Sequence, residues 1–390
     1  MKIKIKLATF FLLSLIMSLC LFFDNGFLGF HYPDSLSQSP IRSVKIVKGI
    51  TTVNGKPLFP LGFYHVSWQS TAVERIKAMQ NIAKAGFNTI HVSSTTDIND
   101  ESSYGDFLDR SAQQGIYVIT EQQINLQNVV KEFKHKPAVL AWNIADDVND
   151  GKQTPHDIRQ LNHKIKSLDS NHITYISGYS DEIYKFENCS DIIAMQSYPI
   201  GNNDEISSTY RRVSLTRETV APFNGTVYAN IQAFSWSDSQ EHLKHPVIPT
   251  FNEVRNMTYQ ALVAGAKGII YYTYYDRSWY LPDHPQLWEG LKSLVPEIKT
   301  ITPFLLQGSW RKIDINYPNI FGAIWVLNGQ ALAIVVNASD QAIDHLIISL
   351  PISVKNLHSS VPEISEMNFG QGKLYGKIQP LAVHIYSGNL

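Results

Sequence analysis

The chain has 390 residues, of which 44% are apolar, and its formal net charge is −1 with histidine neutral. This apolar content excludes a disordered chain, and the absence of a basic stripe argues against nucleic-acid binding. The length is more than one ordinary domain needs.

Residues 1–30 are predicted to be a signal peptide or an N-terminal membrane anchor. Lys2, Lys4 and Lys6 precede a 16-residue, largely apolar run from Ala8 to Phe23. That run is at the short end for a membrane span, so a signal peptide is the first choice and an uncleaved anchor stays open. We therefore expect a secreted, periplasmic or outer-surface protein, with the membrane contacted only through an uncleaved N-terminus.

Residues 45–306 alternate short apolar stretches with helical patterns, as parallel α/β proteins do. Eight strands within about 230 residues predict a (β/α)8 TIM barrel. A doubly wound sheet would normally carry a glycine-rich phosphate turn after its first strand, and Gly62-Phe63-Tyr64 is not one. The predicted strands cover 58–64, 88–92, 116–120, 138–144, 173–176, 191–196, 226–231 and 268–272, and the main helices cover 72–85, 104–114, 126–133, 155–168, 207–220 and 250–264.

The pattern changes after a helix predicted to end near Ile301. Four strand-like runs follow, over 321–327, 331–336, 345–350 and 382–387, and Asn328-Gly329 is a strong hairpin signal. Residues 308–390 are thus predicted to form a small antiparallel, sandwich-like β domain.

The active site of such a barrel lies at the carboxyl ends of its strands, so the residues there are the site candidates. They combine amides, carboxylates and aromatic rings, which suits a carbohydrate. The histidines are too scattered to predict a metal, and no cofactor is predicted. The predicted substrate-binding residues are Tyr64, His65, Trp68, His91, Asn143, Gln196, Tyr198, Gln232, Trp236, Tyr274, Asp276 and Trp279.

Three stretches point to a known superfamily. They are Val53–Tyr64 (VNGKPLFPLGFY), Pro137–Asp147 (PAVLAWNIADD) and Gly265–Tyr272 (GAKGIIYY). Together they resemble bacterial glycoside-hydrolase barrels, in which the fourth strand commonly ends W-x-x-x-D-E-P. The resemblance covers residues 45–305 and implies hydrolysis of O-glycosidic bonds.

The sequence departs from that pattern at the catalytic positions. Asp147 stands where the resemblance implies a glutamate general acid/base, after Asp146 and before Val148 instead of proline. Gln232 stands where a nucleophilic glutamate is implied, and an amide cannot serve as that nucleophile. Glycoside hydrolysis uses two carboxyl groups, so we predict Asp147 as the acid/base with Asp146 or Glu121 as partner.

Other carboxylates remain candidates for the second role. They are Asp276, Glu241 and Glu253, although Thr250-x-x-Glu253 reads as a helix capping box and favours a structural role for Glu253. Two rivals to a hydrolase stay open: a non-catalytic carbohydrate-binding barrel, and a membrane-anchored component of an exopolysaccharide system.

Overall fold

The computed structural model describes residues 43–390 except 65–70, 95–100, 122–124, 240–246 and 361–365. Residues 1–30, with the predicted signal peptide or anchor, lie outside the described residues. Within the described ranges, no helix is both long and apolar enough to cross a membrane.

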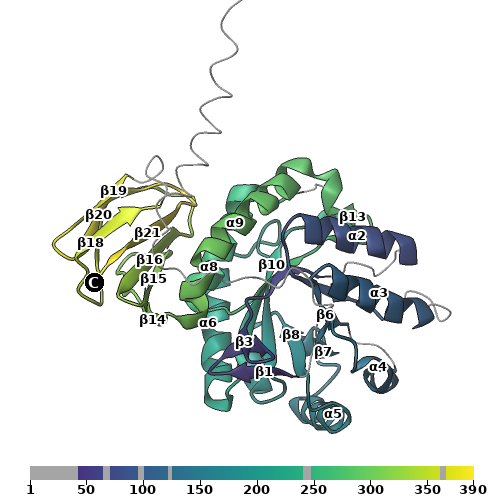
Figure 1. Ribbon diagram of the computed structural model, residues 1–390. Coiled ribbons are helices and arrows are strands. Elements are labelled where there is room, and N and C mark those ends of the chain that lie inside the picture. The colour runs from purple at the N-terminus through teal and green to yellow at the C-terminus, as the bar shows by residue number, and fades with distance from the viewer. Residues whose placement is uncertain (1–42, 65–70, 95–100, 122–124, 240–246, 361–365) are drawn as a thin grey trace, which may run out of the picture. The chain divides into compact units, whose positions relative to one another are not determined.

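Eight parallel strands close into a barrel, as the sequence predicts (Figure 1). Each strand pairs with the next in the chain, and the last pairs with the first through Ile269–Leu61, Ile270–Gly62 and Tyr271–Phe63. The strands are β4 (Leu61–Phe63), β5 (Thr89–Val92), β6 (Tyr117–Thr120), β7 (Val139–Ala145), β8 (Ile173–Gly178), β9 (Ile192–Ser197), β10 (Thr226–Gln232) and β11 (Ile269–Tyr272).

Helices form the layer outside the strands (Figure 1). Two of them have the predicted bounds, and capping boxes at Thr71, Thr154 and Thr250 begin three of them. The last helix runs past its predicted end near Ile301, because its buried apolar face continues to Leu306 despite two internal prolines. The helices are α2 (Ala72–Lys84), α3 (Glu101–Gln113), α4 (Leu126–Phe133), α5 (Pro155–Leu168), α6 (Ser208–Val220), α7 (Trp236–Ser239), α8 (Phe251–Ala264) and α9 (Pro285–Gln307).

Short elements complete the barrel. A three-stranded sheet of β1 (Val44–Val47), β2 (Ile50–Val53) and β3 (Lys56–Pro57) precedes it. A two-stranded hairpin follows β11, made of β12 (Tyr275–Asp276) and β13 (Trp279–Tyr280). The short 3-10 helices are η2 (Val148–Asp150), η3 (Asp181–Phe186), η4 (Ala221–Phe223) and η5 (Leu281–Asp283).

An antiparallel β domain follows α9, as predicted, with more strands than the sequence pattern reveals. One sheet has the order β14-β15-β16-β21-β18 and the other has the order β17-β20-β19. The strands are β14 (Ser309–Lys312), β15 (Ile320–Leu327), β16 (Gln330–Asn337), β17 (Ile343–Ser349), β18 (Asn356–Ser359), β19 (Met367–Gly370), β20 (Lys373–Ile378) and β21 (Val383–Asn389).

The five-stranded sheet is apolar on both faces. Along β16, Ala331, Ala333 and Val335 join the core shared with the three-stranded sheet. The alternate residues Leu332, Ile334 and Val336 join the core of the barrel. Since successive side chains of a strand point to opposite faces, this sheet is a middle layer, covered by barrel helices on one side. The continuous apolar run of β16 is explained by burial on both faces.

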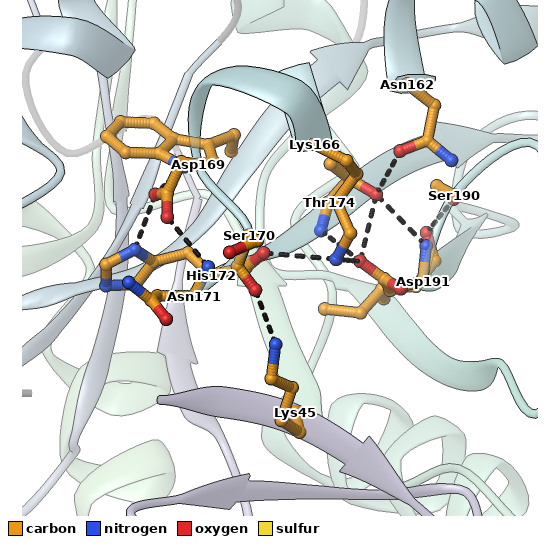
Figure 2. A network of polar contacts seen from close by, with 12 residues as sticks. Lys45, Asn162, Lys166, Asp169, Ser170, Asn171, His172, Thr174, Ser190 and Asp191 are labelled. Atoms are coloured by element: carbon orange, nitrogen blue, oxygen red, sulfur yellow. Dashed lines mark hydrogen bonds and ion pairs between the residues drawn. The ribbon is translucent and has the colours of Figure 1, made fainter. Parts of the chain in front are cut away.

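The amino-terminal end of the barrel is held by buried polar contacts (Figure 2). Asp169 accepts hydrogen bonds from the Trp142 indole at 2.9 Å and from the His172 imidazole at 2.6 Å. Burial works to raise the pKa of Asp169, but these two donors and the charge on His172 outweigh it and lower that pKa to about 2. Because Trp142 is part of β7, the network anchors the strand that carries Asp146 and Asp147 at its other end.

A second group of contacts lies beside the first in Figure 2. Asp191 accepts from the Lys166 ammonium at 2.7 Å and from the backbone N–H of Thr174 at 2.8 Å. Lys45 reaches from β1 to the backbone carbonyl of Ser170. These contacts join α5, the starts of β8 and β9, and the small sheet that contains β1 at the amino-terminal end of the barrel.

We predict that Asp169→Asn lowers the free energy of unfolding by about 3 kcal/mol at pH 7, because it replaces a buried carboxylate that accepts hydrogen bonds from Trp142 and His172. The Asp169 pKa is lower in the folded chain than the usual unfolded value of about 3.9, so its contribution is present above pH 4 and is lost as pH falls towards 2. Urea unfolding of both proteins between pH 2 and pH 7 should therefore show the difference shrinking at acid pH.

A matched control is Asp109→Asn, which removes the half-exposed ion pair between Asp109 and Lys136. We expect it to cost less than about 1 kcal/mol. Equal stability of Asp169→Asn and the unchanged chain at pH 7 would contradict the prediction.

Candidate functional site

The site is built at the carboxyl end of β7, where Asp146 and Asp147 follow seven buried strand residues. The pairing of β7 with β8 shifts by one residue between Asn143 and Ala145. Such a β-bulge changes which way the following side chains point, and bulges are frequent beside active sites. Asp147 then adopts the left-handed conformation, with φ 49° and ψ 42°. This backbone is uncommon outside glycine and sets the direction of the Asp147 side chain.

Asp146 is the centre of a hydrogen-bond network that spans the barrel mouth. Its carboxylate accepts from the hydroxyls of Tyr64 at the end of β4 and Ser177 on β8. It also accepts from the Gln196 amide of β9 at 3.3 Å and from the backbone N–H of Asp147 at 3.1 Å. Four donors on one half-buried carboxylate stabilise its ionised form.

Asp147 has a different environment, although it is the next residue. It is exposed, and Gln196 donates to its Oδ1 at 2.8 Å. The same Gln196 nitrogen contacts both aspartates, so the two carboxylates lie on one side of the barrel mouth. The pair therefore consists of one carboxylate committed to neighbouring donors and one that faces solvent.

A cleft of about 350 Å³ opens beside this pair, which is within the usual range for small-molecule sites. Lys152 and Asp150 form an ion pair of 2.8 Å there. The hydrogen bond and charge of Asp150 raise the pKa of Lys152, and the charge of Asp147 adds to the effect. The cleft is lined by Asp146, Asp147, Val148, Asp150, Lys152 and Gln153.

Aromatic rings form a continuous wall at the mouth. The ring of Tyr272 lies 5.2 Å from that of Tyr64, 5.3 Å from Tyr198 and 5.2 Å from Phe234, and Phe234 lies 5.0 Å from Trp236. Burial is the largest cause that raises the pKa values of the Tyr64, Tyr198 and Tyr272 hydroxyls well above the usual value. Nearby carboxylates raise all three further, and for Tyr198 the neighbouring Tyr272 contributes before them. These phenols therefore stay neutral and can act as hydrogen-bond donors.

Asp276 and Glu121 are the other carboxylates near this wall. Asp276 is buried and accepts from the Tyr272 hydroxyl at 2.9 Å. Glu121 follows β6 and is also buried. The charges of Asp276, Asp146 and Glu121 all raise the pKa of Tyr272, so this phenol lies among the three.

The predicted residues of β5 and β7 meet below the mouth. The Nε2 of His91 contacts the side-chain nitrogen of Asn143 at 3.2 Å, and the His91 ring centroid lies 3.8 Å from that of Tyr64. Both side chains are fully buried. His91 therefore packs directly against the Tyr64 ring, and Asn143 contacts His91 from β7.

Gln232 is the last residue of β10, and its side chain is buried. It is fully buried, its Oε1 accepts from the backbone N–H of Ile200, and its Nε2 donates to the carbonyls of Ile200 and Phe234. The Gln232 amide thus holds the backbone at Ile200, which follows β9. The predicted contact of Gln232 with a sugar stays a prediction.

The remaining predicted residues divide between the wall and the core. Tyr198 and Trp236 belong to the wall, and the Trp236 indole donates to the Tyr198 carbonyl at 3.2 Å. Tyr274 instead packs against Phe63 and Trp288, and Trp279 is buried with its indole bonded to the Thr273 carbonyl. Glu253 forms the predicted capping box with Thr250. His65, Trp68 and Glu241 lie outside the described residues.

Sequence reasoning missed two contributors to the site. Ser177 lies just beyond the predicted fifth strand, which ends at Ile176, whereas β8 continues to Gly178. Tyr272 is the last residue of the predicted eighth strand and is not among the predicted site residues, although Tyr274, which would share its strand face by alternation, is one of them. A cis peptide bond between Tyr272 and Thr273 falls between them in the structure.

Among the described residues, no group of three or more histidine, cysteine or acidic side chains is arranged to hold a metal ion.

Comparison with solved structures shows that glycoside hydrolases share the fold of this chain, a (β/α)8 barrel with a C-terminal β domain. One similar structure is described only as a glycoside hydrolase, with a TM-score of 0.64, 15% identity, and coverage of 89% of this chain and 96% of that chain. The α-amylase from Geobacillus thermoleovorans, solved with acarbose, has a TM-score of 0.58 at 9% identity, covering 84% and 98%.

A third similar structure is Amy13B from Eubacterium rectale, with a TM-score of 0.57 at 10% identity, covering 90% of this chain and 100% of that chain. No protein-family model matches the sequence, and no curated protein matches it. At these identities the comparisons establish the fold, and the chemistry has to be argued from the site.

We predict that Tyr64→Phe costs about 2 kcal/mol of unfolding free energy, because it removes a donor from the buried side of a charged carboxylate. The matched control is Tyr175→Phe, whose hydroxyl bonds the neutral Asn230 amide at 2.9 Å and should cost about 1 kcal/mol. Chemical denaturation at pH 7 measures both.

Repeating Tyr64→Phe in an Asp146→Asn background tests whether Asp146 is the group to which the Tyr64 hydroxyl donates. Without the Asp146 charge, the loss of unfolding free energy caused by Tyr64→Phe should be smaller. An unchanged cost in that background would show that the Tyr64 hydroxyl acts through another group.

Proposed function

We propose that the protein is a glycoside hydrolase that cleaves O-glycosidic bonds in an oligo- or polysaccharide. The observation that carries the proposal is the adjacent pair Asp146 and Asp147, whose environments differ sharply in one cleft. Because Asp146 takes up the neighbouring donors, Asp147 is left as an accessible carboxyl group at a strand end, where it can give or accept a proton.

Asp147 is the proposed general acid/base. It is exposed at the cleft and carries a single side-chain donor from Gln196, so its carboxyl group is accessible to a leaving oxygen or a water. The bulge in β7 and the left-handed backbone at Asp147 support this role, because they alter the position of a side chain one methylene shorter than glutamate. Asp146 is the proposed positioning residue, since its oxygens are occupied by protein donors.

The second carboxylate has to come from the other side of the scissile bond. In the eight-stranded ring, β11 is the fourth strand from β7 in either direction, so Asp276 follows the strand opposite Asp147. Glu121 follows β6, which is next to β7. Topology therefore favours Asp276 over the sequence-based partners Glu121 and Asp146.

The aromatic wall supports a carbohydrate ligand. Tyr272, Tyr198 and Trp236 are partly exposed at the mouth, where ring faces stack on the apolar faces of sugars. The solved structures with this fold include an α-amylase with acarbose bound, and we extend that ligand class to this chain as part of the proposal.

A second candidate function is carbohydrate binding without turnover. The observation that favours it is Gln232, which replaces the expected nucleophile and is committed to the backbone of Ile200 and Phe234. A barrel without an effective second carboxylate would keep the aromatic wall and lose the chemistry.

We expect Asp147→Ala and Asp276→Ala each to lower the rate of aryl-glycoside hydrolysis by at least about 100-fold, because each removes one of the two reacting carboxyl groups. Added sodium azide should restore part of the rate in both variants, since the small anion fits the vacated space. Release of the aryl group from a panel of pyranosides measures the effect.

The matched control is Asp150→Ala, which removes a carboxylate from the same cleft without touching the pair, and should keep activity within about threefold. Full activity of Asp276→Ala would move the second role to Glu121 or Asp146. Binding of polysaccharide by the unchanged chain with no turnover would favour the second candidate function.

We also propose that the protein is exported, because Lys2, Lys4 and Lys6 precede an apolar run ending at Phe23. Cell fractionation with N-terminal sequencing tests this: a mature chain beginning after that run indicates a cleaved signal peptide. An intact N-terminus in the membrane fraction indicates an anchor, and an intact chain in the cytoplasm contradicts export.

A further inference from the structure

A second cleft lies where the barrel meets the β domain, away from the aspartate pair. Its volume is about 470 Å³, larger than that of the cleft beside Asp147. It is formed by the start of α6 and by the connection from β14 to β15. The six lining residues that matter here are Tyr210, Lys312, Asp314, Asn316, Tyr317 and Phe321.

This cleft opens at the same end of the barrel as the aspartate pair. Helix α6 follows β9, so its first turn, with Tyr210, lies at the carboxyl ends of the strands. The buried Gln260 fixes this turn by accepting from the Tyr210 N–H and donating to the Ile206 carbonyl, both at 3.0 Å. Tyr210 and the aspartate pair therefore lie at the same end of the barrel.

The cleft combines flat rings with planar polar groups. Tyr317 is 38% exposed, and its hydroxyl donates to the His345 carbonyl at 3.3 Å, which limits rotation of the ring. Tyr210 and Phe321 stack face to face, with ring centroids 3.9 Å apart and planes inclined by 8°. An exposed ring held in place loses little freedom when a sugar packs on it.

The charges in the cleft offset one another. Lys312 and Asp314 are its only lysine and carboxylate among the described lining residues, and they lie 3.7 Å apart. Asn316 adds an amide that can both donate and accept hydrogen bonds. This chemistry fits hydroxyl groups and does not select for either sign of charge.

We propose that this cleft is an accessory binding site for an uncharged polysaccharide, with Tyr317 as its stacking platform. The site holds a part of the polymer remote from Asp147. The proposal goes beyond the proposed hydrolase activity, because it requires binding only and applies equally to a non-catalytic barrel.

The test is affinity electrophoresis of the full chain in native gels containing amylose, xylan or mixed-linkage β-glucan. All proteins carry Asp147→Ala, so that no polymer is degraded during the run. Tyr317→Ala and Asn316→Ala should each weaken retardation by the polymer that binds best, by at least about fivefold in apparent Kd, which corresponds to the loss of one stacking or bidentate contact.

The matched control is Tyr375→Ala, which removes a tyrosine on β20 that is 44% exposed and lies outside the cleft. It should leave retardation unchanged. Because Tyr317 is exposed, its removal should not unfold the chain, and circular dichroism checks this.

Three outcomes would overturn the proposal: equal effects of Tyr317→Ala and Tyr375→Ala, no retardation of the parent protein by any of the three polymers, or stronger retardation by a polyanion such as pectin. Failure of hydrolysis with retained, Tyr317-dependent binding would refute the proposed activity and leave this site standing. Hydrolysis by Tyr317→Ala with Asp147 intact, together with unchanged polymer affinity of Tyr317→Ala in the Asp147→Ala background, would do the reverse.

Discussion

Closure of the barrel is the constraint on which the rest of the structure depends. Strand β11 pairs with β4 across more than half of the chain, and the pairing brings all eight strand ends to one mouth. The approach is close at Gly62, where a Cβ atom would lie 1.6 Å from the carbonyl oxygen of Thr89. Any larger residue at that position would push the first two barrel strands apart.

Closure also explains why one carboxylate can collect donors from distant parts of the sequence. Tyr64, Ser177 and Gln196 belong to three strands, yet all donate to Asp146. Their convergence engages the Asp146 carboxylate in hydrogen bonds, while its neighbour Asp147 stays exposed at the cleft. The division of roles that we propose follows from this difference in surroundings, because the two side chains are chemically identical.

The β domain is bound to the barrel by an apolar layer rather than by a few surface contacts. Trp325 and Leu332 of the middle sheet belong to the barrel core, and Asn256 of α8 donates to the carbonyls of Asn337 and Leu381. The connection that carries Tyr317 joins two strands of this sheet, β14 and β15. The proposed accessory site is thus formed where the middle sheet meets the start of α6.

The sequence by itself determined the elements whose signals are local. Apolar periodicity and turn residues predicted α4 and α5 with their observed bounds and all eight barrel strands, because these patterns act over a few residues. They also identified Asp146 and Asp147 as a pair at a strand end. Only the tertiary structure decided how such residues are used. The bulge before Asp146, the burial of Gln232 and the place of β11 opposite β7 all follow from barrel closure and strand register, which join residues far apart in the chain.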